Sequence, residues 1–228
     1  MLLGLQGANV ALVDLHKPQQ VLDEVEKLGG KALASSCDVQ DGDALEAVME
    51  NVVQHFGGID GAANMAGILG SQGIKGQGHA VDRVPDGEWD QILGVNLNGI
   101  KNSMHAELRH MKDGGTVVNA GSVAGQPGLP FMAPYCANKW AVLGLTQVAA
   151  QESGIRGIRI NAVAPGVIRT PMIQGAATDS ELYDSLGFRT ALKRLAEPEE
   201  VARVIVFLLS KEASYITGAV INIDGGFS

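Results

Sequence analysis

The sequence predicts an α/β fold in which helices cover both faces of a doubly wound parallel sheet. Short apolar runs alternate with stretches of helical periodicity along the whole chain, and this alternation is typical of parallel sheets. The 30 glycines are spread along the chain, many of them at the ends of these runs, where they favour tight turns. No linker, repeat or change in composition divides the chain, so residues 1–228 are predicted to form a single domain.

Three strands and two helices are predicted in the first third of the chain. The strands are expected at Asn9–Asp14, Ala32–Ser36 and Ile59–Ala63. A helix begins at Lys17-Pro18, because proline favours the first helical turn, and it ends at Gly29-Gly30. The stretch 41–56 has apolar residues at 45, 48, 49, 52, 53 and 56, which is the spacing of a helix with one buried face.

The rest of the chain continues the same alternation. Helices are predicted at Glu88–Met111, Ala133–Glu152 and Pro198–Leu209, and strands at Gly115–Ala120, Ile158–Val163 and Ala219–Ile223.

Charge and composition exclude several classes of function. A net charge of −8 and a pI near 5.1 provide no basic surface for nucleic acid or for an anionic membrane. Cys37 and Cys136 lack paired spacing, and the five histidines form no helical ligand pair, so no disulfide and no metal site are expected. The chain has no apolar run of about 18 residues, and its apolar opening lacks the basic residues of a leader. We therefore expect a cytoplasmic protein with reduced cysteines.

Tyr135 and Lys139 lie four residues apart at the start of the predicted helix 133–152. This separation is about one helical turn, so the phenol and the ammonium share a face. A cation in this position stabilises phenolate, and we expect it to lower the pKa of Tyr135. Taken alone, the pair is equally compatible with a surface helix that carries an aromatic residue and a lysine.

Two further residues give this pair a context. Ser122 follows the predicted strand 115–120, thirteen residues before Tyr135, at the edge where open α/β sheets bind ligands. Asn96 lies within the long predicted helix. In order and spacing, Asn96, Ser122, Tyr135 and Lys139 resemble the catalytic tetrad of the classical short-chain dehydrogenase/reductase family. The resemblance implies a Rossmann-like fold and an oxidoreductase that interconverts a secondary alcohol and a ketone.

Four other segments resemble motifs of the same family. They are Asn64-Met65-Ala66-Gly67, where Ala63 replaces a preceding asparagine, Cys37-Asp38-Val39, Pro165–Thr170 and Ile223–Gly226. The resemblance implies that the cofactor contacts Asp14, Asp38, Val39, Asn64, Ala66, Gly67, Tyr135, Lys139, Pro165, Gly166, Val167 and Thr170. Each segment also has a plainer interpretation, since Asn64 could cap a turn and Asp38 could cap a helix.

The resemblance also implies a role for each member of the tetrad. Tyr135 would be the acid/base on the substrate oxygen, and Ser122 would polarise that oxygen. Lys139 would depress the pKa of Tyr135 and hold the nicotinamide ribose, while Asn96 would hold a water between Lys139 and solvent. Asp14 at a strand end favours NAD over NADP, because it accepts ribose hydroxyls and repels a 2′-phosphate. His16 and Lys17 could soften that repulsion, and Asp14 could instead cap the following turn.

One family feature is missing from the printed sequence. The glycine-rich phosphate loop lies about 20 residues before the acidic residue, and counting back from Asp14 places that loop before Met1. The predicted sheet therefore lacks its first, central strand, and strands 9–14 and 59–63 lack a shared neighbour. Three explanations stay open: a misassigned start, a fragment, or a truncated relative with cofactor-independent acid/base chemistry such as dehydration, isomerisation or cyclisation. A non-catalytic partner subunit is a further alternative.

Substrate and assembly are predicted only in outline. Residues 170–192 occupy the place of the family's substrate lid and are largely apolar, which favours an apolar ketone or alcohol. The glycine-rich stretch 69–87 either borders the same site or is a mobile surface loop. The resemblance implies a homodimer or homotetramer paired through helices 88–111 and 133–152, with Ala141, Leu145, Val148 and Ala149 as interface residues.

Overall fold

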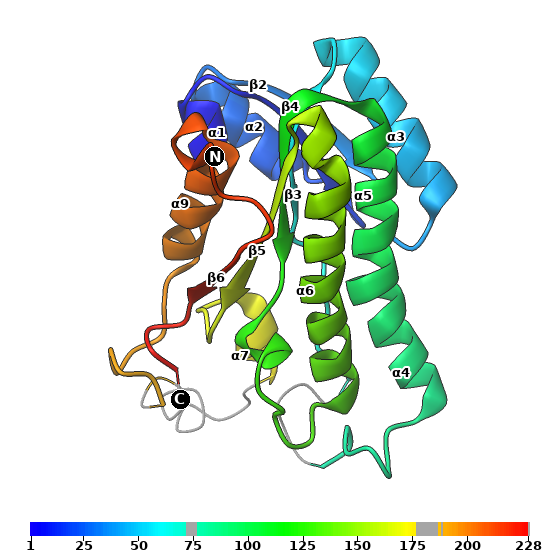
Figure 1. Cartoon of the computed structure of the whole chain (residues 1–228), viewed down its shortest axis with the longest axis vertical. Helices are drawn as coiled ribbons and strands as arrows, with labels where there is room; N and C mark the ends of the chain where they lie inside the picture. The colour runs from blue at the N-terminus through cyan, green and yellow to red at the C-terminus, as the bar shows by residue number, and fades with distance from the viewer. Residues whose placement is uncertain (72–76, 177–186, 188, 228) are drawn as a thin grey trace.

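The strands of this protein form two separate parallel sheets in a computed structural model that describes residues 1–71, 77–176, 187 and 189–227 (Figure 1). One sheet pairs β1 (Asn9–Asp14) with β2 (Lys31–Ser36). The other has the order β3 (Ile59–Asn64), β4 (Met111–Ala120), β5 (Arg159–Pro165) and β6 (Val220–Ile223). All of these pairings are parallel, which confirms the predicted α/β fold.

The division between the two sheets falls where the sequence predicts it. Within the described residues β1 pairs only with β2, and β3 only with β4, so each has one unpaired backbone edge. Burial reflects this difference: no residue of β1 is fully buried, whereas β5, which has a partner on each side, is buried from Ile160 to Ala164. The prediction that strands 9–14 and 59–63 lack a shared neighbour is confirmed.

Helices cover both faces of the larger sheet. The longer helices are α2 (Gln19–Lys27), α3 (Gly42–Phe56), α4 (Asp86–Leu93), α5 (Gly99–His110), α6 (Ala133–Ser153) and α9 (Pro198–Leu209), with shorter ones at α1 (Leu2–Leu5) and α7 (Pro171–Ala176). α3, α5 and α6 pack on one face and α9 on the other (Figure 1). Val117 and Val118 show why, because successive strand residues point to opposite faces and these two join the two different cores.

The long helix predicted from Glu88 to Met111 is present from Asp86 to His110, with a change of helical type in its middle. A π-helical turn, Gly94–Asn98, separates α4 from α5, and the helix ends at His110 because Met111 already belongs to β4. Glycine at position 99 lets this region pack closely, since a Cβ there would lie 2.5 Å from the Val39 side chain. π-turns inside helices are frequent at functional sites. No described helix is long and apolar enough to span a membrane.

Candidate active site

Ser122 and Tyr135 meet at the carboxyl end of β4. Ser122 caps a short 3-10 turn, Val123–Gly125, and its Oγ accepts a hydrogen bond from the Ala124 amide at 3.1 Å. Tyr135 lies in the first turn of α6, and its phenol lies close enough to the Ser122 side chain for that hydroxyl to lower the pKa of the phenol. A hydroxyl pair at this edge of a parallel sheet is placed to hold one oxygen atom of a ligand.

Lys139 lies one turn after Tyr135 and is buried, whereas Tyr135 is partly exposed. Its Nζ lies 5.6 Å from the centroid of the Tyr135 ring and donates to the carbonyl of Ala120 at 2.7 Å. Only 3% of Lys139 is exposed, and this burial lowers the pKa of its ammonium to about 8. The shared face predicted for these two residues is therefore present.

The expected lowering of the Tyr135 pKa is not present in this structure. Burial raises the pKa of Tyr135 above its ordinary value, while the hydrogen bond from Ser122 acts in the opposite direction. The reason is desolvation, since a phenolate loses more by leaving water than a neutral phenol does. The neutral phenol is thus the form that the folded chain favours at neutral pH.

Asn96 lies in the π-turn and binds the backbone of the segment that follows β3. It is fully buried, its Nδ2 donates to the carbonyl of Ile68 at 2.8 Å, and its Oδ1 accepts from the Ile68 amide at 2.7 Å. A Cβ at Gly67 would lie 3.3 Å from Asn96 Oδ1 and 3.8 Å from Lys139 Nζ. Asn96, Gly67 and Lys139 therefore meet in space, although the first two lie far from the third in sequence.

Asn64, a predicted cofactor contact, is held at the end of β3 by a buried hydrogen-bond network. The side chain is 8% exposed and points into the core, where Nδ2 donates to Glu107 Oε2 and to Asn119 Oδ1, both at 3.0 Å. Asn119 continues the network by donating to Thr146 Oγ1 at 3.0 Å. Both amide protons of Asn64 are therefore used inside the protein, and these bonds fix the residue at the end of β3.

Glu107 is a buried carboxylate that the sequence reasoning missed. It is 5% exposed and lies on the face of α5 that also buries Ile100 and Met104. Burial raises its pKa to about 7, and the hydrogen bond from Asn64 opposes that rise. The sequence does contain a signal for it. Positions 100, 104, 107 and 111 have the spacing of one helix face, and a glutamate at 107 stands among apolar residues at the other three.

The predicted adenosine contacts lie at the ends of the smaller sheet. Asp14 is the exposed last residue of β1. Asp38 follows β2, and its carboxylate accepts from the Gln40 amide at 2.9 Å, so it closes its own turn, while Asp41 is the residue that caps α3. Val39 contributes its carbonyl to Asn102 Nδ2 at 3.0 Å.

The segment after β5 packs directly on the C-terminal motif. The amide of Gly166 donates to Ile223 at 3.0 Å, and a Cβ at this glycine would lie 2.9 Å from Asp224 Cα. The two motifs that lie farthest toward the C-terminus therefore form one unit at the carboxyl ends of β5 and β6. Thr170 precedes α7, and its Oγ1 donates to the carbonyl of Ile168 at 3.4 Å. Residues 177–186 and 188 of the predicted substrate lid lie outside the described residues.

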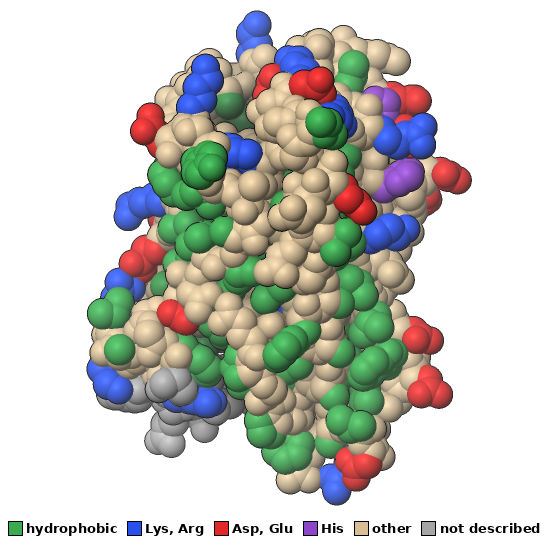
Figure 2. Space-filling view, viewed as in Figure 1, with side chains coloured by type: hydrophobic (Ala, Val, Ile, Leu, Met, Phe, Trp, Pro, Cys, Tyr) green, Lys and Arg blue, Asp and Glu red, His purple; other side chains and the backbone are tan. Residues whose placement is uncertain are grey.

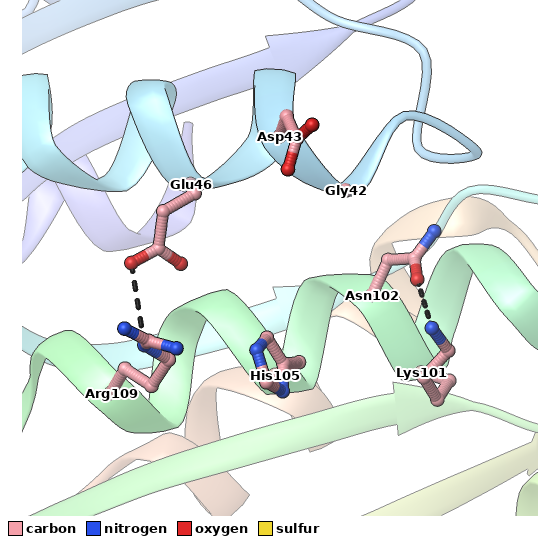
Figure 3. Close-up of a pocket in the computed structure, with 7 residues that line it drawn as sticks. All are labelled: Gly42, Asp43, Glu46, Lys101, Asn102, His105 and Arg109. Carbon is pink, nitrogen blue, oxygen red and sulfur yellow. Dashed lines mark hydrogen bonds and ion pairs between the residues drawn. The ribbon is translucent and has the colours of Figure 1, made fainter.

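A separate cavity of about 310 Å³ lies between α3 and α5 (Figure 3). It is lined by Gly42, Asp43, Glu46, Lys101, Asn102, His105 and Arg109. Glu46 pairs with Arg109 across it at 3.4 Å, so its charges are partly neutralised. None of the residues predicted for the active site lines this cavity.

Comparison with known proteins finds relatives that match almost the whole chain. The family described as enoyl-(acyl carrier protein) reductase matches residues 2–228. Cyclohexanol dehydrogenase from Acinetobacter sp. is 38% identical, and the match covers 100% of this chain and 88% of that protein. Short-chain dehydrogenase/reductase ABA4 from Pyricularia oryzae is 37% identical, with coverage of 99% of this chain and 85% of that protein.

Solved structures give the same result. The structure of levodione reductase is 34% identical with a TM-score of 0.89, and the match covers 98% of this chain and 89% of that one. A short-chain dehydrogenase/reductase from Serratia marcescens is 33% identical with a TM-score of 0.90, and it covers 99% of this chain and 90% of its own. The chain therefore belongs to the short-chain dehydrogenase/reductase family, a family of oxidoreductases that use NAD or NADP.

Proposed function

We propose that this protein is an NAD-dependent oxidoreductase that interconverts a secondary alcohol and a ketone on a small apolar molecule. The observation that carries the proposal is the neighbouring pair of hydroxyl groups of Ser122 and Tyr135 beside the buried ammonium of Lys139. The pair places two hydroxyl groups where they can hold a single substrate oxygen, and the adjacent cation stabilises negative charge on that oxygen or on the phenol.

Each of these residues has a defined task in the proposed reaction. In reduction, the phenol of Tyr135 donates its proton to the carbonyl oxygen, and in oxidation it takes the proton of the alcohol. Ser122 donates a hydrogen bond that polarises the same oxygen. Lys139 stabilises the phenolate left after proton donation and, anchored on Ala120, keeps a constant position. The nicotinamide cofactor, when bound, supplies or accepts the hydride.

The residues at the two ends of the cofactor site fit NAD. The glycine at position 67 leaves open the approach to the Lys139 ammonium, which would hold the nicotinamide ribose. Asp14 is exposed at the carboxyl end of β1, where a carboxylate accepts both adenosine ribose hydroxyls and disfavours a 2′-phosphate. Among the described residues, no glycine-rich turn lies in the space between β1 and β3, where it could hold the pyrophosphate. The proposed contacts with NAD are therefore limited to its two ribose ends.

An apolar substrate agrees with the side chains around the site. Met65, Phe131 and Met172 are large apolar residues with exposed fractions of 44%, 46% and 41%, and each lies in a segment that adjoins a site residue. Phe131 has a positive φ of 64°, a backbone conformation that is uncommon for residues other than glycine. The relatives named cyclohexanol dehydrogenase and levodione reductase support a cyclic alcohol or ketone as the substrate class.

We also propose that two copies pair through the exposed face of α6. Trp140 and Val148 are each 53% exposed on this helix. Gly144 lies between them in sequence, Ala137 lies one turn before Trp140, and both are exposed. Hydrophobic side chains gather over the lower parts of α6 and α4 (Figure 2). One predicted interface residue is wrong, because Ala149 is 6% exposed and belongs to the core of its own protomer.

The function is tested with a panel of cyclic ketones that includes cyclohexanone. The purified chain is assayed with NADH and with NADPH, each at several millimolar, by the fall in nicotinamide absorbance. We expect turnover with at least one ketone and a preference for NADH. If NADH binds by titration yet no ketone of the panel is reduced, the proposed reaction is wrong, and a preference for NADPH would refute the role of Asp14.

A further inference from the structure

A buried histidine and a carboxylate connect the loop after β3 to the start of α4. His79 is 1% exposed, and its Nε2 lies 3.1 Å from Glu88 Oε1. The same carboxylate accepts from Ser71 Oγ at 2.7 Å and from the Ser71 amide. These bonds lower the pKa of Glu88, so it is ionised at neutral pH. Glu88 thus joins two described segments, one at Ser71 and the other at His79.

Gly70 shows how closely this cluster is packed. A Cβ at this position would lie 2.5 Å from Glu88 Oε1, 2.6 Å from Ile92 Cδ1 and 2.9 Å from His79 Cε1. The residue also has a φ of +84°, a conformation that favours glycine. The backbone conformation and the lack of space for a side chain therefore both require glycine at this position. The contacts among Gly70, His79 and Glu88 are thus tightly packed.

The backbone of His79 reaches the start of α6. Its carbonyl accepts from the Ala133 amide at 3.1 Å, and His79 forms an isolated parallel bridge with Met132. The first amides of a helix have no partner inside the helix and need one from outside. The carbonyl of His79 gives such a partner to Ala133, the first residue of α6.

We propose that Glu88 and His79 are positioning residues that fix the first turn of α6, and with it Tyr135, relative to the helix that leads to Asn96. Glu88 lies on α4, which continues directly into the π-turn that carries Asn96. Tyr135 lies two residues after Ala133. The cluster therefore bridges the two helical segments that hold the proposed catalytic groups. The expected effect of the cluster on catalysis rests on the proposed function, in which Tyr135 transfers the proton. The expected effect on the position of α6 is independent of that function.

The test combines hydrogen exchange with kinetics on the purified chain. The variants are Glu88→Gln, His79→Ala and the double variant, and Glu199→Gln in the first turn of α9 is the matched control. We expect faster amide exchange, by roughly tenfold, in the peptide 127–140 and unchanged exchange in the peptide 198–209. We also expect kcat to fall about tenfold or more while KM changes little, because the phenol is displaced and binding is retained. The double variant should be no worse than the worse single one, since both remove the same contact.

Glu88→Gln keeps the size of a partly exposed side chain, so it reports on the cluster even if His79→Ala fails to fold. Unchanged exchange at 127–140 in Glu88→Gln would overturn the proposal, and so would exchange that rises equally in all peptides. Altered exchange with unchanged kcat would overturn the catalytic part. A wild-type chain that reduces no ketone would refute the proposed function, while the exchange result would still decide whether the cluster positions α6.

Discussion

Tyr135 and Lys139 show how burial sets the chemistry of two neighbouring side chains. Burial disfavours the charged form of each, so it raises the pKa of the phenol and lowers that of the ammonium to about 8. The phenol is then protonated at neutral pH and ready to donate to a carbonyl oxygen. Once it has donated, the phenolate is left beside a lysine that is still mostly cationic. These two shifts agree with the proposed reduction of a ketone near neutral pH.

Glu107 leads to a prediction about stability and pH. Its pKa in the folded chain is raised to about 7 from an ordinary value of 4.5, so the folded state binds this proton more tightly than the unfolded state does. The associated stability is present below pH 4.5 and is lost as the pH rises to about 7. Over this window we expect a loss on the order of 3 kcal/mol that the neutral variant Glu107→Gln does not show.

Urea unfolding of both proteins at pH 4.5 and pH 7.5 checks this prediction. Glu199→Gln is the control, because it changes an exposed glutamate on α9 and should keep the wild-type pH dependence. An identical pH dependence in wild type and Glu107→Gln would contradict it.

At the scale of elements, periodicity predicted the helices and strands well but not their interruptions. The spacing of Tyr135 and Lys139 predicted a shared helix face, and the structure has it in α6. The π-turn at Gly94–Asn98 adds one residue to a helical turn, too small a change to alter the apolar pattern of residues 88–111. A side-chain direction such as that of Asn64 depends on Glu107, a partner 43 residues away, and no local pattern records such a contact.

The exposed face of α6 leads to a prediction about assembly. If Trp140 and Val148 meet the same helix of a second copy, the double variant Trp140→Glu/Val148→Glu places buried, unpaired carboxylates in that interface. We expect the wild-type chain to have at least dimeric mass by light scattering at micromolar concentration and the variant to be monomeric. Val81→Glu, at a residue that is 85% exposed outside this face, is the control. A monomeric wild type would refute the interface.

At the scale of the whole molecule, the open edges of β1 and β3 bear directly on cofactor affinity. Asp14 and Lys139 are the contacts proposed for the two riboses of NAD, and among the described residues no glycine-rich turn lies between the two sheets to hold its pyrophosphate. The net charge of −8 adds no attraction for that anion. Charge-assisted hydrogen bonds contribute about 1.5–3 kcal/mol each, so the lack of several weakens binding by about two decades or more.

Calorimetric titration of the 228-residue chain with NAD checks this expectation. We predict a dissociation constant in the millimolar range, and a much lower one for a version that carries an added strand and glycine-rich loop before Met1. Micromolar affinity of the 228 residues alone would contradict it and would indicate that another segment or subunit supplies the phosphate site.

The central claim is that Tyr135 transfers the proton, and one comparison of kcat tests it most directly. Tyr135→Phe removes the phenolic oxygen and little packing, whereas Tyr215→Phe makes the same change at a fully exposed residue. Both are assayed beside wild type with the best ketone of the panel and saturating NADH. We predict that Tyr135→Phe lowers kcat by about 10²-fold or more, as expected for an acid/base, and that Tyr215→Phe leaves it unchanged. A Tyr135→Phe variant that retains more than about a tenth of wild-type kcat would contradict the account.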